Sequence, residues 1–385
     1  MKQLLTDARA MLPEMIEIRR DIHMHPELGR KEKRTQALVI RALEALGLQP
    51  RVVADTGVMA DIVGGQSGKN IALRADMDAL PLDERTGCAF ASQTPGAMHA
   101  CGHDLHTTAL LGAAKLICAR RDMLRGTVRL LFQPDEEMDG GAQRMIDEGC
   151  MEGIDYVYGA HVAPELPAGT VAVCSGKAYA ASNPFDIRVF GSGAHGAEPH
   201  LGTDALTTAC AIVMELQTLV SRELDPLNPA VITIGALTSG TARNILAQGA
   251  ELHGICRSYG QETRAFLSRR IGEIAEHIAL AHGARAETSV QWGYAGIINN
   301  PDATYAIEQT ARALLGEGCV SAYPPTLTTE DFGAFLNHAS GSFWHLGVGR
   351  TGADNPPLHS PFFNPDENAL AIAAAMHAAI ALYAQ

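Results

Sequence analysis

Apolar side chains recur along the chain with two periods that separate helices from strands. Spacings of three and four residues predict helices over 4–22, 35–46, 107–118, 303–314 and 366–383. The pair Gly140-Gly141 opens a further short helix that runs through Ile146 to Gly149, and a turn or helix begins at 328–332. Continuous apolar runs predict buried strands over 71–76, 128–132, 156–160 and 342–348. Helices alternating with buried strands predict an α/β fold whose catalytic domain has a mostly parallel central sheet flanked by helices.

The pattern changes between residues 183 and 293. Here strands at 185–190, 230–237, 251–257 and 286–292 enclose helices at 204–219 and 263–280. The order strand-helix-strand-strand-helix-strand is that of a ferredoxin-like α+β unit. We therefore expect an inserted domain over 183–293, with the first domain formed by 1–182 and 294–385.

Composition narrows the classes of protein that the chain can belong to. Its 385 residues exceed the usual size of one domain, and a hydrophobic fraction of 46% is typical of a globular protein. The net charge of −13, without a basic block, argues against nucleic acid as a partner. No apolar run is long enough to span a bilayer, and no signal-peptide pattern is present. Eight scattered cysteines are typical of reduced thiols, so we expect a cytoplasmic protein without a membrane partner.

The stretch from Met98 to Thr107 gathers a thiol, three imidazoles and a carboxylate around one glycine. Cys101 and His103 flank that glycine, which lets the backbone bend so that both side chains can reach one cation. Thiolate and neutral imidazole suit zinc and its neighbours better than magnesium or calcium. The alternative is a loop that is rich in His and Cys without binding a metal.

Further ligand-type residues stand at the ends of successive predicted strands. Asp76 and Asp78 follow the first strand, three acids ending in Glu136 and Glu137 follow the second, and His161 follows the third. In open α/β sheets, chemistry collects at the carboxyl ends of the strands, and a cation would relieve the repulsion between adjacent carboxylates.

Two other histidine positions require separate interpretations. His359 lies in a loop walled by prolines, whose stiff backbone suits a ligand. His23 and His25 follow the first helix, where capping or packing groups are more common than ligands, and we interpret them as structural.

Together these segments can hold two divalent ions that share a bridging water, through Cys101, His103, Glu136, Glu137, His161 and His359. A metal-bound water is acidified to a pKa of about 7. One of two adjacent glutamates can then bind metal while the other takes the proton of the water and returns it to a leaving amine. This is the chemistry of amide hydrolysis.

The sequence resembles the aminoacylase/carboxypeptidase group of co-catalytic metallopeptidases. Within that group it is most similar to the amidohydrolase branch, which includes hippurate hydrolases and auxin-conjugate amidohydrolases. The similarity spans nearly the whole chain, with the family's motifs in the family's order. The matching segments are Arg74–Pro81, His99–Asp104, Phe132–Glu137, Gly159–Val162, Gly193–His200, Glu330–Phe332 and Leu358–Ser360.

The resemblance implies a role for each of ten residues. Glu136 would be the general base and acid, and His195 of the inserted lid would bind the developing oxyanion, in the same copy or across a dimer interface. Asn244 and Arg257 would grip a substrate carboxylate, and Asp78 would orient a ligand. The metal ligands would be Cys101, His103, Glu137, His161 and His359.

The same resemblance implies two divalent metal ions, a small N-acyl amino acid as substrate and a homodimer formed through the lid. Dimerisation would also cover the lid's outer strand, which would otherwise be an exposed edge. The donor set suits zinc or manganese and also admits nickel or cobalt.

The chain departs from the branch's pattern beside the carboxylate-gripping strand, where it reads Asn244-Ile245-Leu246-Ala247-Gln248, and at Cys256, Leu105 and Asp135. These changes leave the substrate open. The alternative function is a metal-dependent dipeptidase or carboxypeptidase. A rival of another class is a binding module without catalysis, which would need the ligands but not Glu136.

Overall fold

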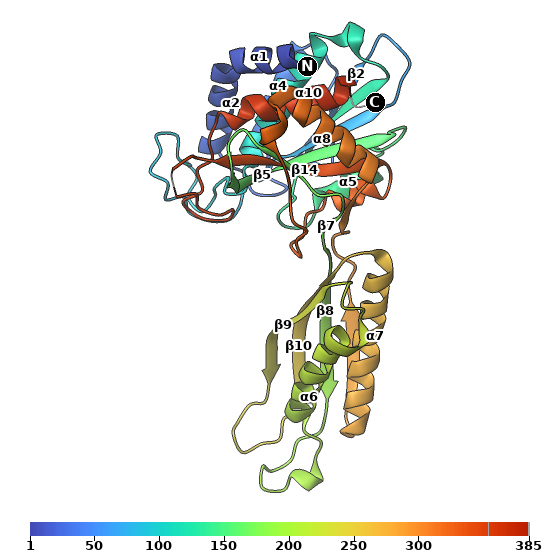
Figure 1. Ribbon diagram of the computed structural model, residues 1–385. Coiled ribbons are helices and arrows are strands. Elements are labelled where there is room, and N and C mark those ends of the chain that lie inside the picture. The colour runs from blue at the N-terminus through green and yellow to red at the C-terminus, as the bar shows by residue number, and fades with distance from the viewer. Residues whose placement is uncertain (353, 384–385) are drawn as a thin grey trace. The chain divides into compact units, whose positions relative to one another are not determined.

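The computed structural model describes residues 1–352 and 354–383, and the chain divides into two compact units. The first unit comprises Met1–Gly176, Ile298–Pro324 and the residues from Asp331 onward. The second unit comprises Lys177–Ile297 and Pro325–Glu330. Figure 1 labels the elements of both.

The first unit is an α/β structure. Its helices are α1 (Lys2–Ala10), α2 (Leu12–Met24), α3 (Lys33–Ala45), α4 (His103–Cys118), α5 (Gly141–Asp147), α8 (Pro301–Leu315), α9 (Gly333–Leu336) and α10 (Ala369–Tyr383). Its central strands are β1 (Arg51–Val53), β2 (Gly57–Val63), β3 (Ile71–Asp76), β4 (Thr127–Gln133), β5 (Tyr156–Pro167), β6 (Val171–Val173), β13 (Val320–Ala322) and β14 (Ser340–Gly349).

These strands form one sheet in the order β1-β2-β4-β3-β5-β14-β6-β13. The central neighbours β4, β3, β5 and β14 are all parallel, whereas β1, β2 and β6 add antiparallel pairs toward the edges. The predicted mostly parallel central sheet, flanked by helices, is therefore confirmed.

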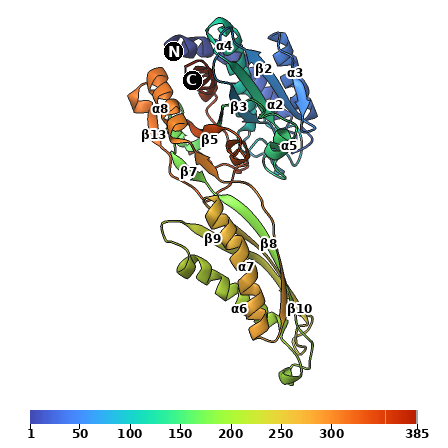
Figure 2. The same cartoon turned by 90° about the vertical axis from the view of Figure 1, so that its right-hand side faces the viewer.

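The helices cover both faces of this sheet (Figures 1 and 2). On one face α4 and α10 pack together, and α1 and α2 pack against them. Helices α4 and α10 are buried on nearly every side because they are apolar almost all around. On the other face lie α5 and α9. Adjacent residues of β14 show the two faces: Trp344 packs beside His377 of α10, whereas Phe343 packs on Phe332.

The second unit contains β8 (Ala181–Phe190), α6 (Ala205–Thr218), β9 (Ala230–Ser239), β10 (Gly249–Ser258), α7 (Gln261–Ala281) and β11 (Arg285–Val290). Its antiparallel sheet has the order β11-β8-β10-β9, which is the ferredoxin-like arrangement of four strands. A separate apolar core joins α6 and α7 to this sheet. The short strands β7 (Gly176–Tyr179) and β12 (Ile297–Asn299) pair with each other.

Three sequence-based boundaries are wrong. The helix expected over 4–22 is two helices that meet at Met11, because Pro13 lacks the N–H that would continue the first helix. Helix α4 begins at His103 rather than at residue 107. Strand β5 continues to Pro167, so that His161 lies within it rather than after it. No helix among the described residues is long and apolar enough to cross a membrane.

Candidate metal centre

The turn that presents Cys101 and His103 depends on the glycine between them. Gly102 is the N-cap of α4 and has a φ of 84°, in the left-handed region that favours glycine. A Cβ added here would lie 2.6 Å from a methyl group of Val162 in β5. The glycine therefore permits both the bend and the close approach of α4 to β5.

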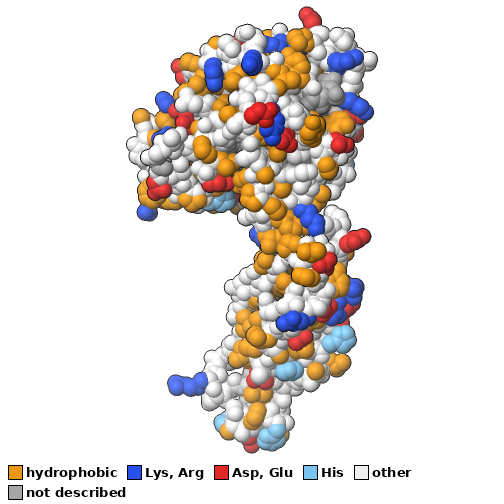
Figure 3. Space-filling view, in the orientation of Figure 1, with side chains coloured by type: hydrophobic (Ala, Val, Ile, Leu, Met, Phe, Trp, Pro, Cys, Tyr) orange, Lys and Arg blue, Asp and Glu red, His pale blue; other side chains and the backbone are white. Residues whose placement is uncertain are grey.

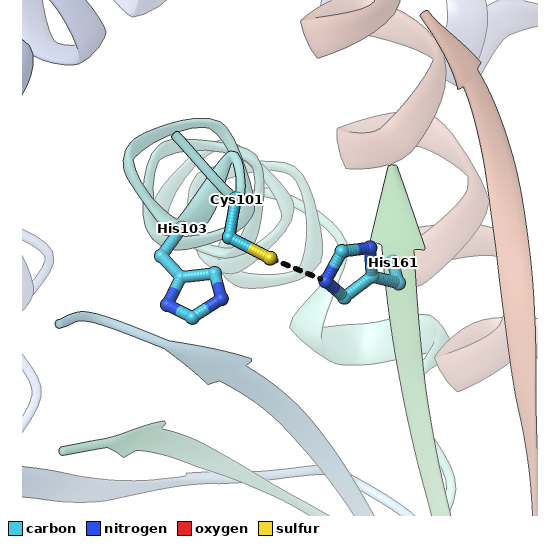
Figure 4. Close-up of side chains that lie close together, drawn as sticks. All are labelled: Cys101, His103 and His161. Carbon is cyan, nitrogen blue, oxygen red and sulfur yellow. Dashed lines mark hydrogen bonds between the residues drawn. The ribbon is translucent and has the colours of Figure 1, made fainter. Parts of the chain in front are cut away.

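Cys101 and His161 face each other across this approach (Figure 4). The sulfur atom lies 3.3 Å from Nε2 of His161. Nδ1 of the same ring lies 2.8 Å from the carbonyl oxygen of Val162 and donates to it. The proton of the neutral ring is thus on Nδ1, which leaves the lone pair of Nε2 directed at the thiol.

His103 is oriented in the same way by Asp78. Its Nδ1 lies 3.2 Å from one Asp78 oxygen, and its buried Nε2 has no hydrogen-bond partner among the described residues. The other Asp78 oxygen accepts the backbone N–H of Glu137 at 3.0 Å. Asp78 thus contacts two candidate ligands, as expected of a residue that orients them.

Glu137 and His359 complete the other side of the cluster. Oε1 of Glu137 lies 3.2 Å from Nε2 of His359 and 3.8 Å from Nε2 of His103. His359 has a φ of 62°, an uncommon conformation for a non-glycine residue, between prolines on either side. Glu136 is buried beside Glu137, 6% exposed.

These side chains fit divalent ions. Overlapping trios of donor atoms lie within 4.8 Å of one another, among them Cys101–His103–His161, Cys101–Glu137–His359 and His103–Glu136–Glu137. Each candidate histidine turns Nε2 inward, and the donors are thiol, imidazole and carboxylate, the set that zinc and its neighbours prefer. The structure therefore brings together all six residues that the sequence pattern selects.

The charges within the cluster also favour a bound divalent ion. Burial, together with Glu137 and Glu136, raises the pKa of the Cys101 thiol well above its usual value. Burial alone would lower the pKa of His103, but Asp76, Asp78 and Glu137 outweigh it and raise that pKa to about 10. Both groups hold protons because negative charge surrounds them, and a divalent ion would replace those protons.

A buried network behind His103 was not assigned by the sequence analysis. Asp76 accepts from Nδ1 of His106 at 2.6 Å and pairs with Arg74, which also contacts Asp331 at 3.1 Å. Nε2 of His106 accepts the backbone N–H of Val162 at 3.0 Å. The sequence does contain an indication of this network, because His106 follows His103 by three residues and therefore lies on the same face of the helix.

The remaining site residues belong to the second unit. His195 and Asn244 lie close together. The backbone of His195 forms an antiparallel bridge with that of Ile245, and the N–H of Gly196 donates to the Asn244 carbonyl at 2.8 Å. Arg257 stands at the opposite end of β10, eight residues from Gly249, or about 26 Å at the rise of a strand. Within one copy of the unit, Arg257 and His195 are therefore not brought together.

Known proteins are similar to this chain over most of its length. The sequence model of "Peptidase family M20/M25/M40" matches residues 72–383. An N-acyl-L-amino acid amidohydrolase of Geobacillus stearothermophilus is 41% identical over 74% of this chain and 78% of its own. Thermostable carboxypeptidase 1 of Saccharolobus solfataricus is 37% identical over 99% of this chain and 98% of its own.

A solved structure agrees with these relatives. The dinuclear metal-binding peptidase of the M20 family from Bacillus subtilis has a TM-score of 0.86 and 33% identity, over 97% of this chain and 98% of that chain. The sequence relatives and this structural relative thus indicate the same family, and the structural relative has a two-metal centre. The chain belongs to the M20/M25/M40 peptidases and is a metal-dependent amidohydrolase with two divalent metal ions.

Proposed function

We propose that the protein hydrolyses the amide bond of N-acyl amino acids and releases a carboxylic acid and an amino acid. The observation that carries this proposal is the pair of adjacent glutamates: Glu137 is part of the donor trios with Cys101 and His359, and Glu136 is buried next to it. The relative named as an N-acyl-L-amino acid amidohydrolase supports the substrate class.

The ligands in this proposal are Cys101, His103, Glu137, His161 and His359. When bound, the two ions supply an acidified water and polarise the substrate carbonyl. The native metal is zinc or manganese, and the same donors accept nickel or cobalt.

Glu136 acts as general base and then as general acid. Its carboxylate takes the proton from the attacking water and delivers it to the leaving amine nitrogen. Its burial keeps bulk water from this carboxylate, which strengthens its interactions with charges that develop beside it.

Arg257 is suited to the substrate carboxylate. One terminal nitrogen of its guanidinium donates to the Thr329 hydroxyl at 3.0 Å, which fixes the plane of the group. The other edge is available for a bidentate pair, the geometry in which a guanidinium binds carboxylates best. Asn244 supplies an amide donor to the same ligand from a second copy.

His195 has the correct tautomer to stabilise an oxyanion. The N–H of Ala197 donates to its Nδ1 at 3.1 Å, so the proton of the neutral ring is on Nε2 and can be donated to the substrate. Because His195 and Arg257 are separated within one copy of the second unit, a homodimer is needed for both to act on one substrate. We propose that the two copies exchange His195 and Asn244 in this way.

The second unit has surface features suited to such an interface. Strand β9 is an edge strand, and exposed apolar side chains lie on it and on α6, among them Val231, Leu206 and Met214. Figure 3 shows hydrophobic side chains at the surface of this unit between charged ones. An unpaired edge with apolar neighbours is a template for pairing with a second copy.

The test is metal removal and reloading combined with a substrate panel. The protein is stripped with chelator, reloaded with zinc or manganese, and offered acetyl, benzoyl and indoleacetyl amino acids together with dipeptides. We expect activity to vanish on stripping, to return with metal, and to be greatest on an N-acyl amino acid. A preference for dipeptides would instead favour the exopeptidase function, as in the carboxypeptidase relative. Metal binding without turnover of any compound would contradict both and favour a binding module.

A further inference from the structure

A second cluster of metal-type donors lies in the first unit, on residues that the proposed reaction does not use. His23 lies in the last turn of α2, and Glu84 and Cys88 lie in the loop between β3 and α4. Nε2 of His23 lies 3.2 Å from Oε2 of Glu84, and the Cys88 sulfur lies 3.6 Å from Oε1 of the same carboxylate. One donor atom from each of the three residues falls within 4.8 Å of the other two.

The orientation of His23 makes Nε2 the donor atom. Its Nδ1 lies 2.8 Å from an oxygen of Asp104 and 3.3 Å from Nη2 of Arg19, and the shorter contact is the one in which Nδ1 donates, to Asp104. In the neutral ring, Nε2 therefore carries a lone pair that faces the lone pairs of the Glu84 carboxylate. Two facing acceptors need a positive centre between them, either a proton or a metal cation.

A second imidazole, that of His99, lies beside this trio and has no hydrogen-bond partner among the described residues. His99 is 1% exposed, and neither of its ring nitrogens makes a hydrogen bond to the described residues. Its ring centre lies 6.3 Å from that of His23. Buried polar atoms without partners are uncommon in folded proteins and indicate an additional group that is not part of the chain.

The nearby cations do not neutralise the trio. Arg19 pairs with Asp104 at 2.7 Å, and Arg20 pairs with Glu367 at 2.6 Å while lying over the Phe90 ring. Each guanidinium is thus matched by a carboxylate outside the trio. The Glu84 carboxylate accepts from the backbone N–H of Ser92 at 2.7 Å and from the Thr86 hydroxyl, which also contacts the Cys88 sulfur at 3.3 Å. Each carboxylate oxygen keeps a further lone pair that can bind an ion.

We propose that His23, Glu84 and Cys88 form a further metal site, separate from the two-metal centre, that binds a thiophilic divalent cation such as zinc. Thiolate, imidazole and carboxylate are zinc ligands, whereas magnesium and calcium prefer oxygen donors alone. Binding releases the Cys88 thiol proton to solvent and joins the sulfur to the metal. The ion would tie α2 to the loop that leads into Cys101, so that it stabilises the segment carrying that ligand.

The test counts zinc and locates it. Zinc-free full-length protein is saturated with zinc, excess metal is removed by gel filtration, and metal per chain is measured by elemental analysis. The wild type should retain about three equivalents and Cys88→Ser about two, since each metal site binds one ion. Cys319→Ser is the matched control, because Cys319 has similar intermediate exposure and lies in the same unit. It should retain about three.

A second measurement on the wild type does not depend on a variant. The alkylation rate of Cys88 is followed by mass spectrometry in zinc-free and zinc-saturated protein, with Cys319 as the internal reference. Because a metal-bound thiolate is a poor nucleophile, zinc should slow alkylation of Cys88 by about tenfold or more and leave Cys319 unchanged. Two equivalents in the wild type, equal metal in wild type and Cys88→Ser, or an unchanged Cys88 rate would each overturn the proposal. None of these outcomes would affect the proposed hydrolysis, which uses other residues.

Discussion

His103 and His161 each turn Nε2 toward the candidate metal centre because an oxygen holds the opposite ring nitrogen. For His103 that oxygen belongs to the Asp78 side chain, and for His161 it is the carbonyl of Val162. The spacing of residues in the sequence selected both histidines but could not show which nitrogen each presents. That choice depends on a neighbour 25 residues away in one case and on the local path of β5 in the other.

The orienting role of Asp78 can be tested by substitution. Asp78→Asn keeps the shape but weakens the acceptor for His103 and for the Glu137 N–H, so the ligands lose part of their orientation. We expect metal affinity to fall about 10- to 100-fold, measured by competition with a chromophoric chelator. Asp61→Asn is the control, because Asp61 pairs with Arg129 on the surface. Equal affinity in Asp78→Asn and wild type would show that Asp78 does not orient the ligands.

His377 provides a prediction about pH. Burial, with a smaller effect of His106, lowers its pKa to about 3, and its Nδ1 has no partner among the described residues. The unfolded chain protonates this histidine near its ordinary pKa of 6.5, whereas the folded protein does not. The free energy of unfolding is therefore unaffected well above pH 6.5 and falls as the pH drops from 6.5 toward 3. Between pH 7 and 5 the wild type should lose about 2 kcal/mol of unfolding free energy through this residue.

The matching variant is His377→Gln, which should remove that loss and flatten the pH dependence. Unfolding of the first unit can be followed by the fluorescence of buried Trp344, in a Trp292→Phe background and without metal. His200→Gln, at an exposed histidine, should keep the wild-type slope. A slope that survives His377→Gln would assign the acid sensitivity to other groups.

Among the elements, α4 and β5 position the metal centre, and both extend beyond their predicted boundaries. The apolar run 156–160 identified the start of β5, but its continuation to Pro167 depends on pairing with β14, which lies far along the chain. Polar residues such as His103 are weak helix signals, and α4 can start there because Gly102 allows the bend. The sequence pattern predicts no strand over 51–63, where β1 and β2 form a short antiparallel hairpin. Such a hairpin is marginally stable alone and gains stability because β2 also pairs with β4 of the larger sheet.

Gly102→Ala tests the contact between α4 and β5. The new methyl group would meet Val162 at 2.6 Å in a left-handed backbone, so both stability and metal affinity should fall. Gly47→Ala is the matched control, because Gly47 also has a positive φ, 75°, but has nothing near its added Cβ. Gly47→Ala should lose only about 1 kcal/mol of unfolding free energy, the cost of a left-handed backbone at alanine, and should keep its metal affinity.

The collision itself can be relieved by a second change. In Gly102→Ala with Val162→Ala, the clashing methyl groups are absent, so metal affinity should recover by about tenfold relative to Gly102→Ala alone. Chelator competition measures all three variants. No recovery in the double variant would show that backbone strain, rather than the approach to β5, limits the site.

In the proposed mechanism His195 and Arg257 act on one substrate. Within the second unit, however, His195 pairs with Ile245, which precedes the start of β10, whereas Arg257 lies near the end of that strand. The motifs identified both residues, but sequence order cannot reveal whether two residues act in one copy or in two. If the homodimer exchanges His195, mixing two inactive variants should restore activity. In a mixed dimer of His195→Ala and Arg257→Ala, one site holds both native residues and the other holds neither.

Random exchange of subunits should therefore restore about a quarter of wild-type activity, since half of the dimers are mixed and each has one complete site. Each variant alone should stay inactive, and light scattering should report a dimer throughout. Absence of complementation in a confirmed mixed dimer would show that His195 of one copy does not act with Arg257 of the other. A monomer would exclude exchange altogether.

In the proposed mechanism, Glu136 moves the proton while the residues around it hold the metal. The most direct measurement compares Glu136→Gln with wild type for metal content and for turnover of the best N-acyl amino acid. Glu136→Gln should keep the same amount of metal per chain and reduce turnover by about a thousandfold or more, because the amide cannot accept the proton of water. Turnover near the wild-type level with metal retained would contradict the assignment of Glu136 as the base.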